Sequence, residues 1–388
     1  MKISRSISFE GFKFKGLKKN LKDKFKKILY ENNEVINSLR TSYKNSYSKQ
    51  IVSKIKKYPE VNIIGMGGSS LGSCAIYNFL NEKIKKKFTF FYNLKIISNK
   101  RNFKKKKLNL IISKSGNTLE TITNLNFHVK KNDKNIFITG NDNSYLRNLA
   151  ENLKTDIIAH NNFIGGRYSV LSEVGMLPAE LMGLNPSKFR QLNNLIKDKN
   201  FTKSLITNVS NTISLVNKKK TNSIILNYDE KSSDLFYWYQ QLISESLGKR
   251  GKGILPIVSS MPKDNHSLLQ LYLDGTKNNF FTFFFVKEKS DKKFKNYGML
   301  DKYKFLKGKK IEDIKFSQFQ ATQNVFRKKN IPFRSFSINK RDEETLGVLF
   351  TFFILETLLL AKAMNVNPFN QPAVEFIKTE TIKILSKD

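Results

Sequence analysis

Two segments rich in glycine and hydroxyl side chains have the residue types that bind phosphate groups. GMGGSSLGS, over residues 65–73, and ISKSGNTLET, over residues 112–121, each follow a short apolar run. Where a buried strand turns into a helix, glycines let the backbone approach a ligand, and the free N–H groups of the helix attract an anion. Hydroxyl groups can complete such a cradle without a metal. Each segment by itself is also compatible with a tight turn or a helix cap.

These segments require a scaffold of strands and helices to hold them. Short apolar runs alternate with amphipathic stretches along the chain, which is typical of βαβ units around a parallel sheet. The runs expected in a first sheet are residues 61–65, 95–98, 108–113, 135–140 and 156–160, and those expected in a second are residues 223–228, 255–259, 280–286 and 333–338. The sequence therefore predicts an α/β fold with two doubly wound parallel sheets.

The predicted sheets divide the chain into parts. We expect a basic N-terminal helical arm over residues 1–50, a first domain over residues 51–190, a second over residues 205–342, and C-terminal helices over residues 343–388. Residues 287–330 are Lys-rich and have the least regular sequence.

Two apolar patterns decide how the ends of the chain are interpreted. In the arm, Leu17, Leu21, Phe25 and Leu29 recur at helical spacing, so we expect an amphipathic helix docked on the body of the protein. A membrane-surface helix or an organellar presequence is the alternative. Residues 346–361 are apolar but short for a bilayer, and Glu356 lies among them, which favours a buried core helix.

The composition limits the kinds of partner and cofactor. Lys and Arg number 69 against 32 acidic residues, for a formal charge of +37 over 388 residues. The basic residues are spread along the chain, so we interpret them as solvated surface and predict no specific nucleic-acid partner and no membrane partner. One cysteine, Cys74, and three histidines make a metal cage improbable, so we predict no metal and no cofactor. The N-terminal segment lacks the continuous apolar run of a secretory signal, which predicts a cytoplasmic location.

Further motifs narrow the function. The spacing of the two Gly- and hydroxyl-rich turns resembles that of sugar-isomerase (SIS) domains, which bind phosphosugars. Four more segments resemble signatures of the glucose-6-phosphate isomerase family: GGRYSVLSEVGMLPAELMG (165–183), WYQQLISESLGK (238–249), DNHSLLQLYLDGTKNNFFTFF (264–284) and NPFNQPAVEFIK (367–378). Six motifs in family order cover residues 60–380, so the chain is identified as a member of this family.

The resemblance implies a reaction and a role for each matching residue. Glucose 6-phosphate and fructose 6-phosphate would be interconverted through a cis-enediol(ate) by a cofactor-free homodimer. Glu245 would be the base that moves the proton, and Arg167 would stabilise the negative charge of the intermediate. His266, supplied across the dimer interface, and Lys378 would open the sugar ring. The residues that would bind the substrate are Gly68, Ser69, Ser113, Lys114, Ser115, Thr118, Glu120, Gly166 and Gln371.

Elementary chemistry is compatible with these roles. Aldose–ketose isomerisation moves a proton between neighbouring carbons, so one carboxylate that reaches both suffices. A guanidinium remains protonated and presents its donors in a fixed fork. Seen alone, however, a helical Glu, a loop Arg or a single His is more often a structural residue.

The chain departs from the family pattern at four positions, and other functions stay open. Arg101 replaces a usual acid, Asn370 a usual Asp, and Ala373 and Ile377 usual glycines. The alternatives are a dual phosphoglucose/phosphomannose isomerase, a non-catalytic phosphosugar sensor, and a nucleic-acid-binding protein. The only support for the last of these is the positive charge of the chain.

Overall fold

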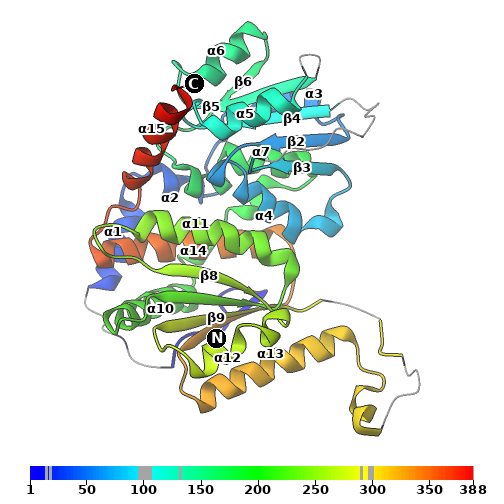
Figure 1. Cartoon of the computed structure of the whole chain (residues 1–388), viewed down its shortest axis with the longest axis vertical. Helices are drawn as coiled ribbons and strands as arrows, with labels where there is room; N and C mark the ends of the chain where they lie inside the picture. Colours follow the sequence, from blue (N-terminus) through cyan, green and yellow to red (C-terminus); the bar gives the residue numbers. More distant parts are fainter. Residues whose placement is uncertain are drawn as a thin grey trace.

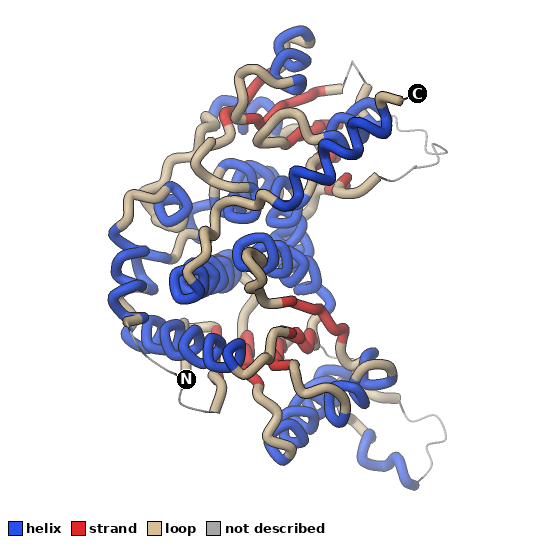
Figure 2. The backbone as a smooth tube through the Cα atoms, turned by 60° about the vertical axis from the view of Figure 1, so that its left-hand side comes forward, coloured by secondary structure: helices blue, strands red, loops and turns tan. Residues whose placement is uncertain are grey.

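The computed structural model describes residues 1–13, 16, 20–94, 107–130, 133–288, 292–295 and 301–387. Two α/β halves are stacked along the long axis of the molecule, each with its own sheet (Figure 1). Helices fill the space between the two groups of strands, as Figure 2 shows from a second direction. The largest apolar cluster includes side chains from both sheets and from these helices, so the halves share one core.

The first sheet has five strands in the order β3-β2-β4-β5-β6, all parallel. Their bounds are β2 Glu60–Ile64, β3 Lys87–Phe91, β4 Lys107–Ile112, β5 Lys134–Thr139 and β6 Asp156–Ala159. The central strands are buried on both faces, as their continuous apolar runs require. Four of the five predicted strands are confirmed. The predicted strand at residues 95–98 lies outside the described residues, and the edge strand β3 was not predicted.

The second sheet has the order β1-β10-β9-β7-β8. Strands β7 (Asn222–Asn227), β8 (Leu255–Ser260), β9 (Asn279–Val286) and β10 (Phe333–Ile338) are parallel and confirm all four predictions. Strand β1 (Ile7–Glu10) pairs antiparallel with β10, which the sequence analysis did not anticipate. Four residues are too few to show an alternating pattern, and the partner strand lies more than 300 residues away in sequence.

Fifteen α-helices lie in the described part of the chain, with short 3-10 helices between them. The helices are α1 Leu21–Tyr30, α2 Glu34–Ser38, α3 Lys49–Ile55, α4 Leu71–Phe79, α5 Leu119–His128, α6 Tyr145–Asn152, α7 Glu173–Leu181, α8 Pro186–Phe189, α9 Leu192–Leu195, α10 Lys199–Asn217, α11 Ser233–Leu247, α12 Leu269–Asp274, α13 Ile311–Lys328, α14 Glu343–Met364 and α15 Ala373–Leu385. The 3-10 helices are η1 Gly67–Ser69, η2 Asn81–Lys83, η3 Gly166–Leu171, η4 Glu230–Ser232, η5 Lys263–His266 and η6 Asp301–Leu306. Within the Lys-rich stretch 287–330, α13 is a regular helix whose buried Phe319 and Phe326 pack against β9.

Helix α14 is a core helix. Among the described helices it is the one long and apolar enough to cross a membrane, but 89% of its apolar window is buried inside the protein. Glu356, in its middle, pairs with Arg334 of β10, and Tyr239 of α11 donates to the same carboxylate at 3.2 Å. The buried charge is therefore compensated, and the expected core helix is confirmed.

The N-terminal arm packs against this core. Leu21, Phe25 and Ile28 of α1 are buried, and an ion pair between Glu31 and Lys362 joins the arm to α14. The docking predicted for the amphipathic helix is confirmed for α1, while Leu17 lies outside the described residues. The domain boundaries themselves stay a prediction.

Candidate active site

The two turns rich in glycine and hydroxyl groups lie side by side at one edge of the first sheet. The first turn, η1, follows β2, and the second follows β4, the strand hydrogen-bonded to β2. A Cβ atom on Gly65 would lie 2.8 Å from the carbonyl oxygen of Ile112, so the two strand ends are in contact. Open α/β sheets bind ligands beyond the carboxyl ends of their strands, which is where these turns lie.

Hydroxyl groups cluster in the second turn. Ser113 Oγ is 2.8 Å from Thr118 Oγ1, and Ser115 Oγ is 3.5 Å from each of them. Thr118 caps α5, and Glu120 lies in the first turn of that helix. Lys114 is half-buried, and burial together with the nearby Arg167 cation lowers the pKa of its ammonium group. The turn thus presents three hydroxyls and a cation at a helix N-terminus, a suitable environment for a phosphate.

The first turn is pressed against the segment that carries Arg167. A Cβ atom on Gly68 would lie 2.0 Å from the carbonyl carbon of Gly166 and 2.4 Å from the amide of Arg167. Ser169 Oγ also donates to the carbonyl oxygen of Gly68 at 3.4 Å. Only glycine fits this approach of η1 to η3, and the approach brings Arg167 to the end of the sheet, where Ser69 is half-buried.

Arg167 is 2% exposed, and all five of its N–H groups are engaged. Nε donates to Ser246 Oγ at 2.9 Å, Nη1 to Glu245 Oε2 at 2.9 Å and Gln371 Oε1 at 2.8 Å. Nη2 donates to the carbonyl oxygens of Pro368 at 2.6 Å and Asn370 at 3.3 Å. A guanidinium has five N–H donors, so no donor is left for a further acceptor unless one of these partners moves.

Glu245 lies near the end of α11 and is held from two sides. Gln241, one turn earlier, donates from Nε2 to Oε1 at 2.9 Å, and Arg167 donates to Oε2 at 2.9 Å. The Glu245 side chain is 33% exposed and lines a cavity of about 470 Å³ together with Gln371. Gln241 Oε1 is buried and has no hydrogen-bond partner within the described residues. An oriented carboxylate therefore borders this cavity, and the residue that orients it has an unpaired acceptor.

The charges around this cavity sum to a positive value. Lys249 and Arg250 line the cavity with Glu245, and Arg167 bonds the Glu245 carboxylate. Arg167 lowers the pKa of Lys249 and also that of Lys114 in the hydroxyl-rich turn. Burial is the largest cause for Lys249 and brings its pKa to about 8. A site with this balance of charges attracts an anionic ligand.

Two predicted catalytic residues are not joined to this cluster in the single chain. His266 ends η5, and its side chain is exposed. Lys378 lies on α15 and bonds Glu375 Oε1 at 2.7 Å, with its side chain 64% exposed. Across the part of the chain that the structure describes, the side-chain partners of Glu245 and Arg167 include neither His266 nor Lys378. In Figure 1, α12, which follows His266, and α15 lie in different halves of the molecule.

The residues of the last motif that depart from the family pattern lie in the loop before α15 and on α15 itself. The backbone carbonyl oxygen of Asn370 accepts a hydrogen bond from Arg167, and this bond does not depend on the side chain of residue 370. Ala373 begins α15, and Ile377 on that helix is 70% exposed. Arg101 lies outside the described residues.

The sequence analysis did not single out several residues that build the site. Gln241 orients Glu245, Ser246 accepts from Arg167, and Trp238 donates from Nε1 to the carbonyl oxygen of Arg167 at 3.1 Å. All three lie in the WYQQLISESLGK motif. Gln241 and Trp238 precede Glu245 by four and seven residues, so helical periodicity could have indicated these two, whereas Ser246 is the neighbour of Glu245 in sequence. In the described ranges, no group of three or more His, Cys, Asp or Glu side chains could hold a metal ion.

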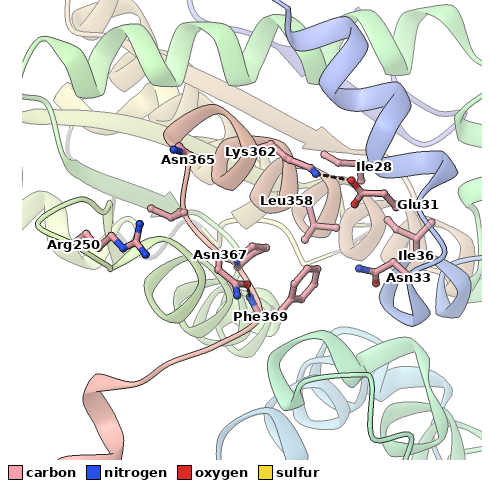
Figure 3. Close-up of a pocket in the computed structure, with 12 residues that line it drawn as sticks. Ile28, Glu31, Asn33, Ile36, Arg250, Leu358, Lys362, Asn365, Asn367 and Phe369 are labelled. Carbon is pink, nitrogen blue, oxygen red and sulfur yellow. Dashed lines mark hydrogen bonds and ion pairs between the residues drawn. The ribbon is translucent and has the colours of Figure 1, made fainter.

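A second cavity, of about 400 Å³, lies between α1, α2, the end of α14 and the loop that follows α14 (Figure 3). Phe369 and Asn367 of that loop border it, and Lys362 and Glu31 are paired on its far side. Val366 and Asn367 line both cavities, so the loop separates them.

Comparison with known proteins defines the class first. The fold matches that of a hypothetical protein from Thermus thermophilus, with a TM-score of 0.80, 22% identity and 94% of each chain covered. It also matches a glucose-6-phosphate isomerase from Chlamydia trachomatis, with a TM-score of 0.66, 19% identity, and 87% of this chain and 72% of that chain covered. The class shown by these structures is a fold: two α/β units built on largely parallel sheets, with surrounding helices.

Sequence comparison then defines the family. A family model described as phosphoglucose isomerase matches residues 18–387. The glucose-6-phosphate isomerase of Methanocaldococcus jannaschii is 33% identical over 349 residues, covering 82% of each protein, and that of Mycoplasmopsis pulmonis is 30% identical over 413 residues, covering 98% of this chain and 92% of the relative. The chain belongs to the phosphoglucose isomerase family and is an isomerase, as the motifs predicted. Membership supports interconversion of glucose 6-phosphate and fructose 6-phosphate.

Proposed function

We propose that the chain interconverts glucose 6-phosphate and fructose 6-phosphate through a cis-enediol(ate), with Glu245 carrying the proton between C1 and C2. The observation that supports this most directly is the Glu245 carboxylate, which Arg167 and Gln241 orient at the wall of the larger cavity. Each carboxylate oxygen accepts one hydrogen bond and keeps a second lone pair. A single carboxylate in this position can take the proton from one carbon and return it to the next.

The phosphate group of the substrate would bind at the two turns. Ser113, Ser115 and Thr118 provide hydroxyl donors and Lys114 a positive charge, while Ser69 and the amide of Gly68 belong to the neighbouring turn. This set of donors holds a phosphate without a metal. Glu120, Gly166 and Gln371 would complete the contacts with the sugar.

Arg167 would stabilise the enediolate mainly through its charge. Because its five N–H groups are all engaged, a direct hydrogen bond to a sugar oxygen requires Gln371 or Glu245 to exchange partners. The Coulomb attraction needs no such exchange and is strong in a buried site. It increases as negative charge forms on the sugar oxygens, which is the condition for lowering the reaction barrier.

Ring opening would require a second copy of the chain. His266 is exposed and separate from the Glu245 cluster, so its proposed role fits a histidine supplied by the partner subunit. Lys378 lies on a helix without any buried residue, on which Phe376, Ile377, Ile382, Ile384 and Leu385 are each at least 60% exposed. An apolar face of this kind favours contact with another surface. The enzyme would act as a cytoplasmic homodimer in glycolysis and gluconeogenesis.

The experiment that tests this function is exchange of the C2 proton of glucose 6-phosphate with deuterated solvent in the presence of a chelator. Wild-type protein should catalyse both exchange and net isomerisation. Glu245→Gln keeps the side-chain size and removes the base, so both rates should fall by about 10²- to 10⁴-fold.

Glu230→Gln provides the control, because it removes an exposed carboxylate that precedes the same helix. Its rates should match those of the wild type. Wild-type exchange in Glu245→Gln would assign the base to another residue, and no turnover by the wild-type protein would contradict the function itself.

A further inference from the structure

The loop between α14 and α15, residues 365–372, has few apolar contacts: Val366 packs against the main core, and the ring of Phe369 lies 5.8 Å from that of Tyr168. Val366 and Asn367 face a cavity on each side, of about 400 Å³ and about 470 Å³ (Figure 3). Asn367, Phe369, Asn370 and Gln371 are all partly or fully exposed. The loop carries Gln371, which accepts from Arg167. These few apolar contacts lie at Val366 and Phe369, so polar contacts contribute to the position of Gln371.

Cationic side chains bind the backbone carbonyls of this segment. Lys252 Nζ donates to the carbonyl oxygen of Met364 at 2.8 Å, and Lys249 Nζ to that of Asn367 at 2.7 Å. The carbonyl oxygen of Pro368 accepts from Arg167 at 2.6 Å and from the hydroxyl of Tyr168 at 3.2 Å. Hydrogen bonds to charged donors are stronger than neutral ones, so these contacts determine where the loop lies.

Among these three cations, Lys249 is the one that joins the loop to the backbone at the end of α11, whereas Arg167 reaches α11 through the side chains of Glu245 and Ser246. Its ammonium group also donates to the carbonyl oxygens of Glu245 at 2.7 Å and Ser246 at 2.8 Å. These two carbonyls belong to the last turn of α11, where they lack partners within the helix and where the helix dipole favours a cation. The three N–H groups of one ammonium thus bind the base-bearing helix and the loop together.

The loop is connected to the Glu245 carboxylate through Arg167. Nη1 of Arg167 is shared between Glu245 Oε2 at 2.9 Å and Gln371 Oε1 at 2.8 Å. Gln371 follows Asn367 by four residues, so a displacement of the loop at Asn367 would move Gln371 away from this arginine. We propose that Lys249 is a positioning residue for the isomerisation, whose ammonium group docks loop 365–372 on α11 and so places Gln371 beside the Arg167–Glu245 pair. This inference rests on the proposed function.

The surroundings of Lys249 make the docking sensitive to alkaline pH. Burial and the Arg167 cation on η3 lower its pKa to about 8, against the opposing effect of the Glu245 carboxylate on α11. The loop itself contributes no titratable side chain, and Arg250 and Lys252 share the turn of Lys249. Loss of the proton near pH 8 removes one of three donors. In the unfolded chain Lys249 has its ordinary pKa of 10.5, so between about pH 8 and pH 10.5 the unfolded chain binds more protons than the folded chain. The contribution of Lys249 to the free energy of unfolding therefore increases as pH rises in this window. We therefore expect activity to fall above about pH 8 as Lys249 loses its proton. This deprotonation should not lower the melting temperature of the protein.

The test compares full-length Lys249→Met, Lys249→Arg and the control Lys203→Met, which removes an exposed cation from α10. Rates with fructose 6-phosphate are measured from pH 6.5 to 9.5. Docking of the loop is measured as the rate at which chymotrypsin cleaves after Phe369, with fragment 370–388 identified by its mass. We expect Lys249→Met to lower kcat roughly 10- to 100-fold at pH 7, from the loss of a charge-assisted contact, with a smaller change in KM. Cleavage after Phe369 should be faster than in the control.

Lys249→Arg should recover part of kcat and lose the alkaline inflection, because a guanidinium remains protonated. Wild-type kcat and wild-type cleavage in Lys249→Met would overturn the proposal. An alkaline inflection in the kcat of Lys249→Arg equal to that of the wild type would also overturn the proposal. This second measurement tests the proposal even if Lys249→Met does not fold. If wild-type protein shows no isomerase activity, the proposed function fails, and the cleavage rates still report whether Lys249 docks the loop.

Discussion

At the scale of single residues, the site is organised by sharing of hydrogen-bond partners. Arg167 of η3 connects Glu245 and Ser246 at the end of α11 with Gln371 of the loop after α14, so one guanidinium joins three segments that are distant in sequence. Lys would supply one charge but could not make these directed bonds, because its ammonium has three donors on a single atom. The hydroxyl cluster of the second turn is simpler, since its members lie within five residues of each other.

A prediction at this scale concerns Ser113 and Thr118, whose oxygens are 2.8 Å apart. Replacing both with Ala should raise KM for fructose 6-phosphate by the equivalent of about 2 to 4 kcal/mol, from two charge-assisted bonds that are not fully additive. Steady-state kinetics over a wide substrate range measures the change. Thr123→Ala, which removes a hydroxyl bonded within α5, is the control. A KM equal to that of the control would locate the phosphate elsewhere.

At the scale of elements, the close approach of η1 to η3 brings the phosphate turn to Arg167. This approach depends on two glycines facing each other, Gly68 and Gly166, rather than on any charged group. The sequence shows both glycines within motifs, but it does not show that they touch, because they are 98 positions apart.

Gly68→Ala should separate these elements. Its Cβ would lie 2.0 Å from backbone of Gly166, so overpacking of about 1 to 3 kcal/mol and a loss of activity are expected. The matched variant is Gly165→Ala, where a Cβ would meet only Tyr168 at 3.8 Å and φ is −66°. Chemical denaturation of both variants measures the difference in unfolding free energy. Equal stability of the two would mean that η1 and η3 are not in contact as described.

At the scale of the whole molecule, one chain brings together part of the proposed machinery. Glu245, Arg167 and Gln371 form a connected cluster, whereas His266 and Lys378 are exposed. A closed two-fold assembly supplies the same residue to both sites, so an incomplete site in one chain is compatible with a complete site in a dimer.

Mixing two inactive variants tests this arrangement. Glu245→Gln and His266→Ala, denatured together and refolded, should form dimers in which one site of the mixed pair has both native residues. With random pairing, about a quarter of all sites would be intact, so activity should rise to about 25% of the wild-type value. Each variant refolded alone is the control. A mixture no more active than these controls would show that His266 does not act across an interface.

The sequence by itself determined most of the strands and the family of the protein. Eight of nine predicted strands are confirmed because each is a continuous apolar run whose burial in a parallel sheet follows from its composition. The ninth lies outside the described residues. Glu245, Arg167 and the hydroxyl turn could be named because their motifs are local.

Only the tertiary structure decided which distant segments meet. Strand β1 pairs with β10 across more than 300 residues, and too few residues are involved for any local pattern to reveal it. Lys249 looks like an ordinary surface lysine in sequence, yet three carbonyls from a helix end and a separate loop surround it. The five partners of Arg167 come from two segments, the end of α11 and the loop after α14, so their convergence on Arg167 depends on how the chain packs. Local patterns specify burial and backbone geometry, whereas such contacts between distant segments depend on how the whole chain packs.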